Sequence, residues 1–380
     1  MNDSANDKSR LRFSLKEFSG SLGDLGLFIP LVVAVTQFSG MNLGVILIAA
    51  GLMNIATGYL FRQPIPVQPM KAIAAVAITD SLAQGSIMAA GMGMAIILFA
   101  LSLSGGIELI RRYIPDSLVR GIQLGVGVKL AIKGGQWITE LPSIGLNSML
   151  TALIVSALLL LFIVKKIPGL LFIFIAGFLL VYLEKPLLFS DLEFAMPPFI
   201  LIWPSAMDWQ TGILQGTLPQ LPLTLLNSVI AVCALSADYF PQQGIKPRQM
   251  AASVAMMNFI CVPFGAIPMC HGAGGLAAQY SFGARTGGSV IMLGTMKLLM
   301  GLVIGGFLVQ VLSAYPYAIL APMLIFAGIE LAKSFLLLNT KADFAIAIIT
   351  AIGILSWNTL SGFLLGGSMA LGYALWKKYD

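Results

Sequence analysis

The fold is decided by the stretch Gln63-Pro64-Ile65-Pro66-Val67-Gln68-Pro69-Met70-Lys71. Each proline removes a backbone N–H donor and its ring clashes with the preceding turn, so no regular helix can run through this stretch. Apolar chain lies on both sides of it, which predicts a helix that begins near Met70 inside a membrane and not at its surface. The free N–H groups and the positive dipole end of that helix would lie where water is scarce, so an anion is the expected ligand there.

Lys71 falls in the first turn of the same helix. A cation is unfavourable at a helix N-terminus, and near the bilayer centre it costs about 2.5–3.5 kcal/mol on insertion scales. A bound anion would compensate this charge. The alternative is an ion pair with Asp24, which lies in an earlier apolar segment.

The composition is that of a polytopic membrane protein. Of the 380 residues, 58% are hydrophobic and 10% are charged, and the mean hydropathy is +0.92. At about 20 residues per span, such a chain has room for on the order of twelve to fourteen crossings and for no soluble domain of ordinary size. We therefore predict an all-α protein in the lipid bilayer of the cell membrane, either a plasma membrane or a bacterial inner membrane.

The apolar pattern predicts fourteen segments, seven in each half of the chain. A polar tail at 1–17 precedes the first half (18–184), and a linker at 185–216 separates it from the second half (217–380). The tail lacks the apolar run and cleavage site of a signal peptide, so we expect it to stay cytoplasmic. The segments are 22–38, 42–60, 67–80, 86–104, 114–131, 147–164, 168–184, 217–235, 249–266, 268–282, 289–312, 316–334, 342–358 and 360–376.

The basic residues support this count. With both termini cytoplasmic, Lys133 and Lys185 are the basic residues that fall outside, while Lys71, Lys129 and Lys297 lie within segments. The others of the 22 fall on the inner side or, for Arg120 and Lys333, toward the inner ends of their segments, as expected for a cytoplasmic bias. The net charge of +6 thus reflects topology and calls for no nucleic-acid partner.

Short stretches of the first half return in the second. Gly127-Val128-Lys129-Leu130-Ala131 matches Gly328-Ile329-Glu330-Leu331-Ala332, and Pro69-Met70-Lys71-Ala72 matches Pro268-Met269-Cys270-His271. An odd number of crossings per half makes the second copy inverted. Segments three and ten would then be half-helices, each preceded by a short extended stretch. Their N-termini would face one another across a glycine-lined gap and form an anion site.

A family resemblance is carried by Gly23-Asp24-Leu25-Gly26, Pro66-Val67-Gln68-Pro69-Met70-Lys71, Pro219-Gln220-Leu221-Pro222 and Cys270-His271-Gly272-Ala273-Gly274-Gly275. With these motifs the chain resembles the molybdate transporters related to sulfate permeases. The resemblance implies a seven-plus-seven inverted repeat, a homodimer, and a core part (segments 1–4 and 8–11) that moves like an elevator against a gate part (segments 5–7 and 12–14). The chain ends at Asp380, without room for the regulatory domain of sulfate permeases, in keeping with the molybdate branch.

The resemblance implies molybdate as the substrate, imported by secondary active transport with protons as the candidate coupling ion. A sulfate carrier or other anion carrier of the same fold, or an anion channel, is the alternative. Substrate-binding candidates are the residues near the two helix starts and in segment eight: Gln68, Met70, Lys71, Gln220, Asn227, Ser228, Cys270, His271 and Gly272. Neutral donors suit a site that must release its ligand. Interhelical packing is the alternative for Asn227 and Ser228.

Two further roles follow from charge. Asp24 and His271 are the candidates for proton coupling, with a structural ion bridge to Lys71 as the alternative for Asp24 and a satisfied core imidazole for His271. Lys129 and Glu330 occupy matching repeat positions, which predicts an ion pair across the gate part.

An enzyme is not expected. Cys270 and His271 are adjacent, and neighbours on a helix point about 100° apart, so they form no nucleophile and base pair. The sequence has no metal-ligand cluster and no nucleotide-binding loop, so no cofactor is expected, and molybdenum enters only within the oxyanion substrate. A nucleobase carrier would want buried carboxylates in segments eight and ten, where this chain has neutral or basic residues.

Overall fold

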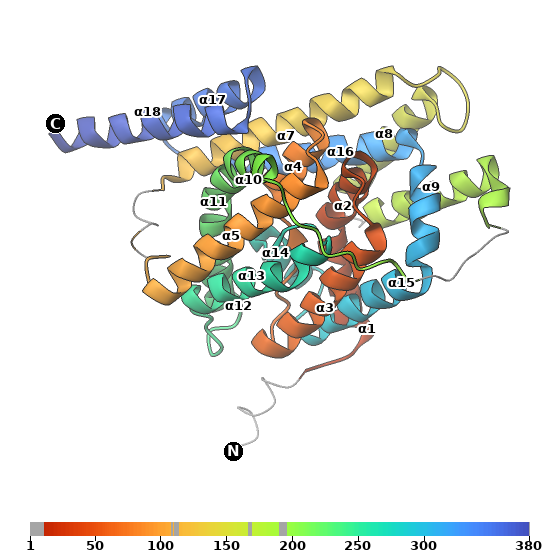
Figure 1. Ribbon diagram of the computed structural model, residues 1–380, viewed down its shortest axis with the longest axis horizontal. Helices are drawn as coiled ribbons and strands as arrows, with labels where there is room; N and C mark the ends of the chain where they lie inside the picture. The colour runs from red at the N-terminus through yellow and green to blue at the C-terminus, as the bar shows by residue number, and fades with distance from the viewer. Residues whose placement is uncertain (1–10, 108, 110–113, 166–168, 190–195, 380) are drawn as a thin grey trace, which may run out of the picture.

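The computed structural model describes residues 11–107, 109, 114–165, 169–189 and 196–379. The described chain is almost entirely helical, as predicted (Figure 1). Its principal helices and strands are α1 (Leu15–Ser21), α2 (Leu25–Ser39), α3 (Leu43–Phe61), β1 (Gln68–Pro69), α4 (Lys71–Thr79), α5 (Gln84–Ser104), α7 (Asp116–Thr139), α8 (Met149–Val164), α9 (Gly169–Glu184), α10 (Ala206–Thr211), α11 (Leu218–Leu223), α12 (Ala231–Tyr239), α13 (Pro247–Cys261), β2 (Met269–Cys270), α14 (Ala273–Ser281), α15 (Gly288–Ser313), α16 (Tyr317–Ala332), α17 (Lys341–Ser356) and α18 (Thr359–Tyr379).

The proline stretch behaves as its chemistry requires. The chain is extended through β1, and helix α4 begins at Lys71. The second strand, β2, pairs with β1 in antiparallel register, Gln68 opposite Cys270 and Pro69 opposite Met269. The Met70 N–H extends this ladder by donating to the Pro268 carbonyl at 2.8 Å. Two short helices of nine residues, α4 and α14, thus start from the two ends of one small ladder.

Four helices in the described residues are long and apolar enough to cross a membrane: α3, α5, the helix Ala206–Tyr239 and the helix Tyr317–Leu337. A bent pair, Leu15–Asp24 with Phe28–Ser39, would make a fifth span. Shorter apolar helices lie at Met149–Phe162, Phe172–Glu184 and Gly288–Val303. The count of fourteen crossings, the inverted repeat and the membrane depth of α4 and α14 stay predictions.

Two helices begin ahead of the predicted segments, and the boundaries of the tail and the linker stay predictions. Residues 1–10 of the predicted tail lie outside the described residues, and α1 begins at Leu15. The helix of segment eight begins at Ala206, inside the predicted linker. Its start is fixed by a capping box, in which Ser205 and Asp208 bond each other's backbone N–H groups. The spacing of these two residues was the signal for an earlier helix start.

The helices pack in two groups. α7 packs against α16 and α17, with α18 beside them, whereas α3 packs against α15 and α5 against α13 (Figure 1). α4 contacts α7 and α2 contacts α16, which joins the groups. Small residues permit the closest crossings: a Cβ at Gly51 would lie 2.6 Å from the Gly294 carbonyl oxygen, across α3 and α15. The division into core and gate parts stays a prediction.

Candidate functional site

The first turn of α4 is capped by a side chain from segment eight. The Oε1 atom of Gln220 accepts from the Ala72 N–H at 2.8 Å and from the Ile73 N–H at 3.4 Å. Its Nε2 atom donates to the Thr224 hydroxyl at 3.0 Å. Gln220, predicted as a donor to the anion, therefore has both ends of its amide engaged and acts here as a helix cap.

Lys71 stands beside this cap without a partner. The residue is half-buried, and no hydrogen bond or ion pair of its ammonium is formed with any described residue. The backbone N–H of Lys71 likewise has no acceptor in the described chain. The ion pair with Asp24, weighed as the alternative for this lysine, is not formed. Lys71 thus brings to the start of α4 a free N–H group and an ammonium that forms no ion pair, although Asp24 and Glu330 are near enough to attract it.

The first turn of α14 has free donors as well. Gly272 is its N-cap, and the N–H groups of Ala273, Gly274 and Gly275 meet no acceptor among the described residues. A Cβ added at Gly274 would meet nothing within 4 Å, so this turn has an open side. Such an end of a helix, with unbonded N–H groups and a positive dipole, favours an anion.

The opposite side of the same turn is filled by Gln68 and Asp24. A Cβ at Gly275 would lie 2.5 Å from Gln68 Nε2 and 2.8 Å from Asp24 Oδ1, and Gly272 lies against Gln68 Oε1. Gln68 Nε2 donates to Asp24 Oδ1 at 2.5 Å. Gln68, predicted to bind the anion, therefore lies at the α14 start with its amide nitrogen held by the carboxylate.

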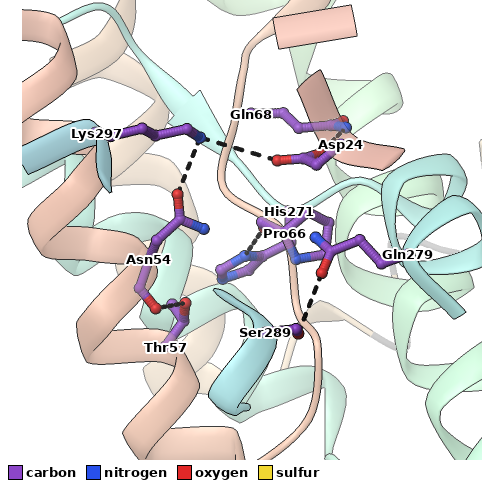
Figure 2. Close-up of polar contacts among 9 residues, drawn as sticks. All are labelled: Asp24, Asn54, Thr57, Pro66, Gln68, His271, Gln279, Ser289 and Lys297. Atoms are coloured by element: carbon purple, nitrogen blue, oxygen red, sulfur yellow. Dashed lines mark hydrogen bonds and ion pairs between the residues drawn. The ribbon is translucent and has the colours of Figure 1, made fainter. Parts of the chain in front are cut away.

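Behind Asp24 lies a buried polar cluster, defined by Asp24, Gln68, Asn54 and Lys297, which Figure 2 shows. Lys297 Nζ lies 4.0 Å from Asp24 Oδ2 and donates to Asn54 Oδ1 at 3.0 Å. It also forms a cation–π contact with Phe28, 3.7 Å from the ring centroid. Asp24 Oδ2, Gln68 Oε1 and Asn54 Nδ2 are buried without hydrogen-bond partners. Such orphaned atoms are rare in packed protein, which marks the cluster as more than packing. Sequence reasoning gave Lys297 and Asn54 no role, although a lysine within an apolar segment is a recognisable signal.

His271 is fully buried and engaged at both ring nitrogens. Nδ1 lies 2.9 Å from the Pro66 carbonyl oxygen and Nε2 lies 3.0 Å from the Ser253 hydroxyl (the first contact is drawn in Figure 2). A carbonyl can only accept, so Nδ1 carries the proton and Nε2 accepts from Ser253. The imidazole thus links the extended chain at Pro66, before β1, to helix α13. This arrangement agrees with the alternative prediction, a buried histidine whose ring nitrogens both have partners.

Replacing His271 with alanine is expected to destabilise the protein by about 1–3 kcal/mol, because the buried Pro66 carbonyl would lose its donor and the half-buried Ser253 hydroxyl its acceptor. Thermal unfolding in detergent measures this loss, with Ser281→Ala, an exposed hydroxyl on α14, as the control. A variant as stable as the wild type but with lost anion affinity would show that the imidazole contacts the ligand directly.

The other predicted residues surround the ladder. Met70 is fully buried, and Cys270 lies opposite Gln68 in the strand pair. Ser228 is buried, and its hydroxyl lies against the Cys270 thiol. Asn227 is half-buried and has no hydrogen bond to any described residue, so its amide is free to reach a ligand.

The predicted pair of Lys129 with Glu330 is not formed. Lys129 Nζ binds Asp80 Oδ1 at 2.5 Å, and Glu330 pairs with Lys333 on its own helix end. The reason is the helix crossing: Gly127 and Gly328 face each other where α7 meets α16. Residues two positions farther on lie about 200° around each helix, so Lys129 and Glu330 point away from the seam.

The sequence and the fold of this chain were compared with those of known proteins. A family model described as a molybdate transporter of the MFS superfamily matches residues 16–130 and 212–331. Molybdate transporter 1 and molybdate transporter 2 of Arabidopsis thaliana are 37% and 39% identical to this chain. The alignments cover 97% and 94% of this chain, and 89% and 84% of those proteins. The murine Solute Carrier 26 family member A9 anion transporter, solved in the inward-facing state, has the same fold, with a TM-score of 0.70, 13% identity, and coverage of 97% of this chain and 69% of that chain.

Proposed function

Because this chain belongs to the molybdate transporter family, we propose that it imports molybdate, or a similar tetrahedral oxyanion, by secondary active transport. The observation that carries this proposal is the pairing of two helix starts with unbonded donors, one of them beside the unpartnered Lys71. No enzymatic reaction is proposed, in keeping with its relatives, which are named as transporters.

The antiparallel ladder explains how one anion could reach both helix starts. Each strand runs directly into its helix, so α4 and α14 leave the ladder in opposite directions and their first turns lie on either side of it. The N–H group of Lys71, those of Ala273 to Gly275 and the Lys71 ammonium are the donors of the proposed site. Most of these are neutral, which favours release after transport.

An elevator-like displacement of the core part is supported by a difference between the two halves in the ion pairs that Lys129 and Glu330 form. Asp80 ends α4, where its negative charge meets the negative end of the helix dipole, and Lys129 of α7 compensates it. At the matching position of the repeat, Glu330 instead pairs with Lys333 within its own helix end. In the proposed motion the Lys129–Asp80 ion pair breaks when α4 moves past α7. The homodimer and the cytoplasmic termini belong to the same proposal.

Proton coupling is assigned in this proposal to Asp24 and not to His271, because both imidazole nitrogens are engaged while Asp24 Oδ2 has no hydrogen bond. An inward-directed proton gradient is expected to accelerate molybdate uptake by proteoliposomes several-fold, and Asp24→Asn to remove that response. His271→Gln is the comparison variant, for which the response should persist. Wild-type uptake that ignores the gradient would point to uniport.

The function itself is tested by molybdate uptake into proteoliposomes, with protein-free liposomes as the control. We expect uptake that saturates and that tungstate and sulfate inhibit, whereas uracil should have no effect. Uptake that does not saturate would favour the channel alternative. Uptake of sulfate with no uptake of molybdate would favour a sulfate carrier of the same fold.

A further inference from the structure

We propose that Lys297 matches the anion site to a divalent oxyanion and so determines its preference for dianions over monoanions. The inference rests on the proposed function and concerns a residue of α15 outside the two helix starts. Lys297 is 1% exposed. Its ammonium lies near Oδ2 of Asp24, whereas Oδ1 of the same carboxylate lies against the first turn of α14.

The need for Lys297 follows from the position of Asp24. Its Oδ1 atom lies against the first turn of α14, where a Cβ at Gly275 would be only 2.8 Å away. A lone carboxylate at this place would repel an oxyanion and would occupy the positive end of the helix itself. The ammonium of Lys297, 4.0 Å from Asp24 Oδ2, offsets that charge, and Asn54 and the Phe28 ring hold it there.

The charges near the site then add up to the charge of a dianion. Counted at their ordinary charges, with Asp24 unprotonated, Lys71 and Lys297 contribute +2 and Asp24 contributes −1, and each of the two helix starts contributes about half a positive charge, which gives about +2 in all. The nearby pairs Lys129–Asp80 and Lys333–Glu330 each cancel. Without Lys297 the total falls to about +1, the complement of a monoanion.

Sulfate and perchlorate separate charge from shape, because both are tetrahedral and have four oxygens but differ by one unit of charge. The test measures how well each displaces radiolabelled molybdate from the purified protein at fixed pH, so it does not depend on transport. In Lys297→Met, the ratio of the two inhibition constants is expected to shift toward perchlorate by about tenfold or more relative to the wild type.

Two further variants keep the test decisive if Lys297→Met is unstable. Asp24→Asn should shift the same ratio the opposite way, toward sulfate. The double variant Asp24→Asn with Lys297→Met restores the charge and should return the ratio near that of the wild type. An equal ratio in all four proteins would overturn the inference while leaving molybdate binding intact. A wild-type protein that binds no molybdate would instead overturn the proposed function beneath it.

Discussion

Gly275→Ala is expected to reduce molybdate transport by about tenfold to a hundredfold. The added Cβ would lie 2.5 Å from Gln68 Nε2, 2.8 Å from Asp24 Oδ1 and 2.9 Å from Pro66 Cγ. Real Cβ atoms do not approach so closely, so the carboxylate, the amide or the extended strand must shift. Overpacking of this kind costs about 1–3 kcal/mol of folding stability. We expect the strain to displace Asp24 and Gln68 toward the anion-binding turn, where each 1.4 kcal/mol lost in transport is a factor of ten. Initial rates of uptake into proteoliposomes measure the effect.

Gly372→Ala is the matched control, because it makes the same exchange inside helix α18 and its Cβ would meet nothing within 4 Å. We therefore expect Gly372→Ala to fold and transport like the wild type. Equal losses in the two variants would mean that the exchange of glycine for alanine in a helix, and not the crowding of Gln68 and Asp24, reduces transport.

Lys71→Met is expected to weaken molybdate affinity by about tenfold to a hundredfold. Its ammonium is unpaired among the described residues, and a hydrogen bond to a charged group contributes about 1.5–3 kcal/mol. The methionine keeps a similar length of apolar chain, so folding should be retained. Removing a cation that forms no ion pair from a helix N-terminus should leave the thermal stability equal or raised.

Lys341→Met serves as its control, because Lys341 is exposed at the start of α17 and distant in sequence from both helix starts. The signature of a ligand role is lost affinity without lost stability in Lys71→Met and neither effect in Lys341→Met. A Lys71→Met protein that binds molybdate as tightly as the wild type would remove Lys71 from the site.

The two helix starts, at α4 and α14, could be predicted from the sequence. The prolines at 64, 66 and 69 forbid a helix, and α4 begins at Lys71, beside the residue where the prediction placed it. The matching motif in the second half led to the second helix start, α14. These features are local, since they depend on which residues lack an N–H group or a Cβ.

The hydrogen-bond and ion-pair partners of the polar side chains could not be predicted in the same way, because they depend on which helix faces meet. Gln220 was recognised as polar near the site, but its role as the cap of α4 needs the contact between segments eight and three. The repeat equated Lys129 with Glu330, yet equivalent positions need not face each other, and the glycine crossing turns both away. Lys297 reaches Asp24 only because α3, α15 and the chain before α2 converge.

The most direct test of the proposed anion site is an electron-microscopy structure with tungstate, whose heavy atom scatters far more strongly than the protein. We predict density for one tungstate between the first turns of α4 and α14, within hydrogen-bonding distance of the Lys71 ammonium and of N–H groups at Ala273 to Gly275. Density at another place, or an empty space between the two turns at saturating tungstate, would contradict this prediction.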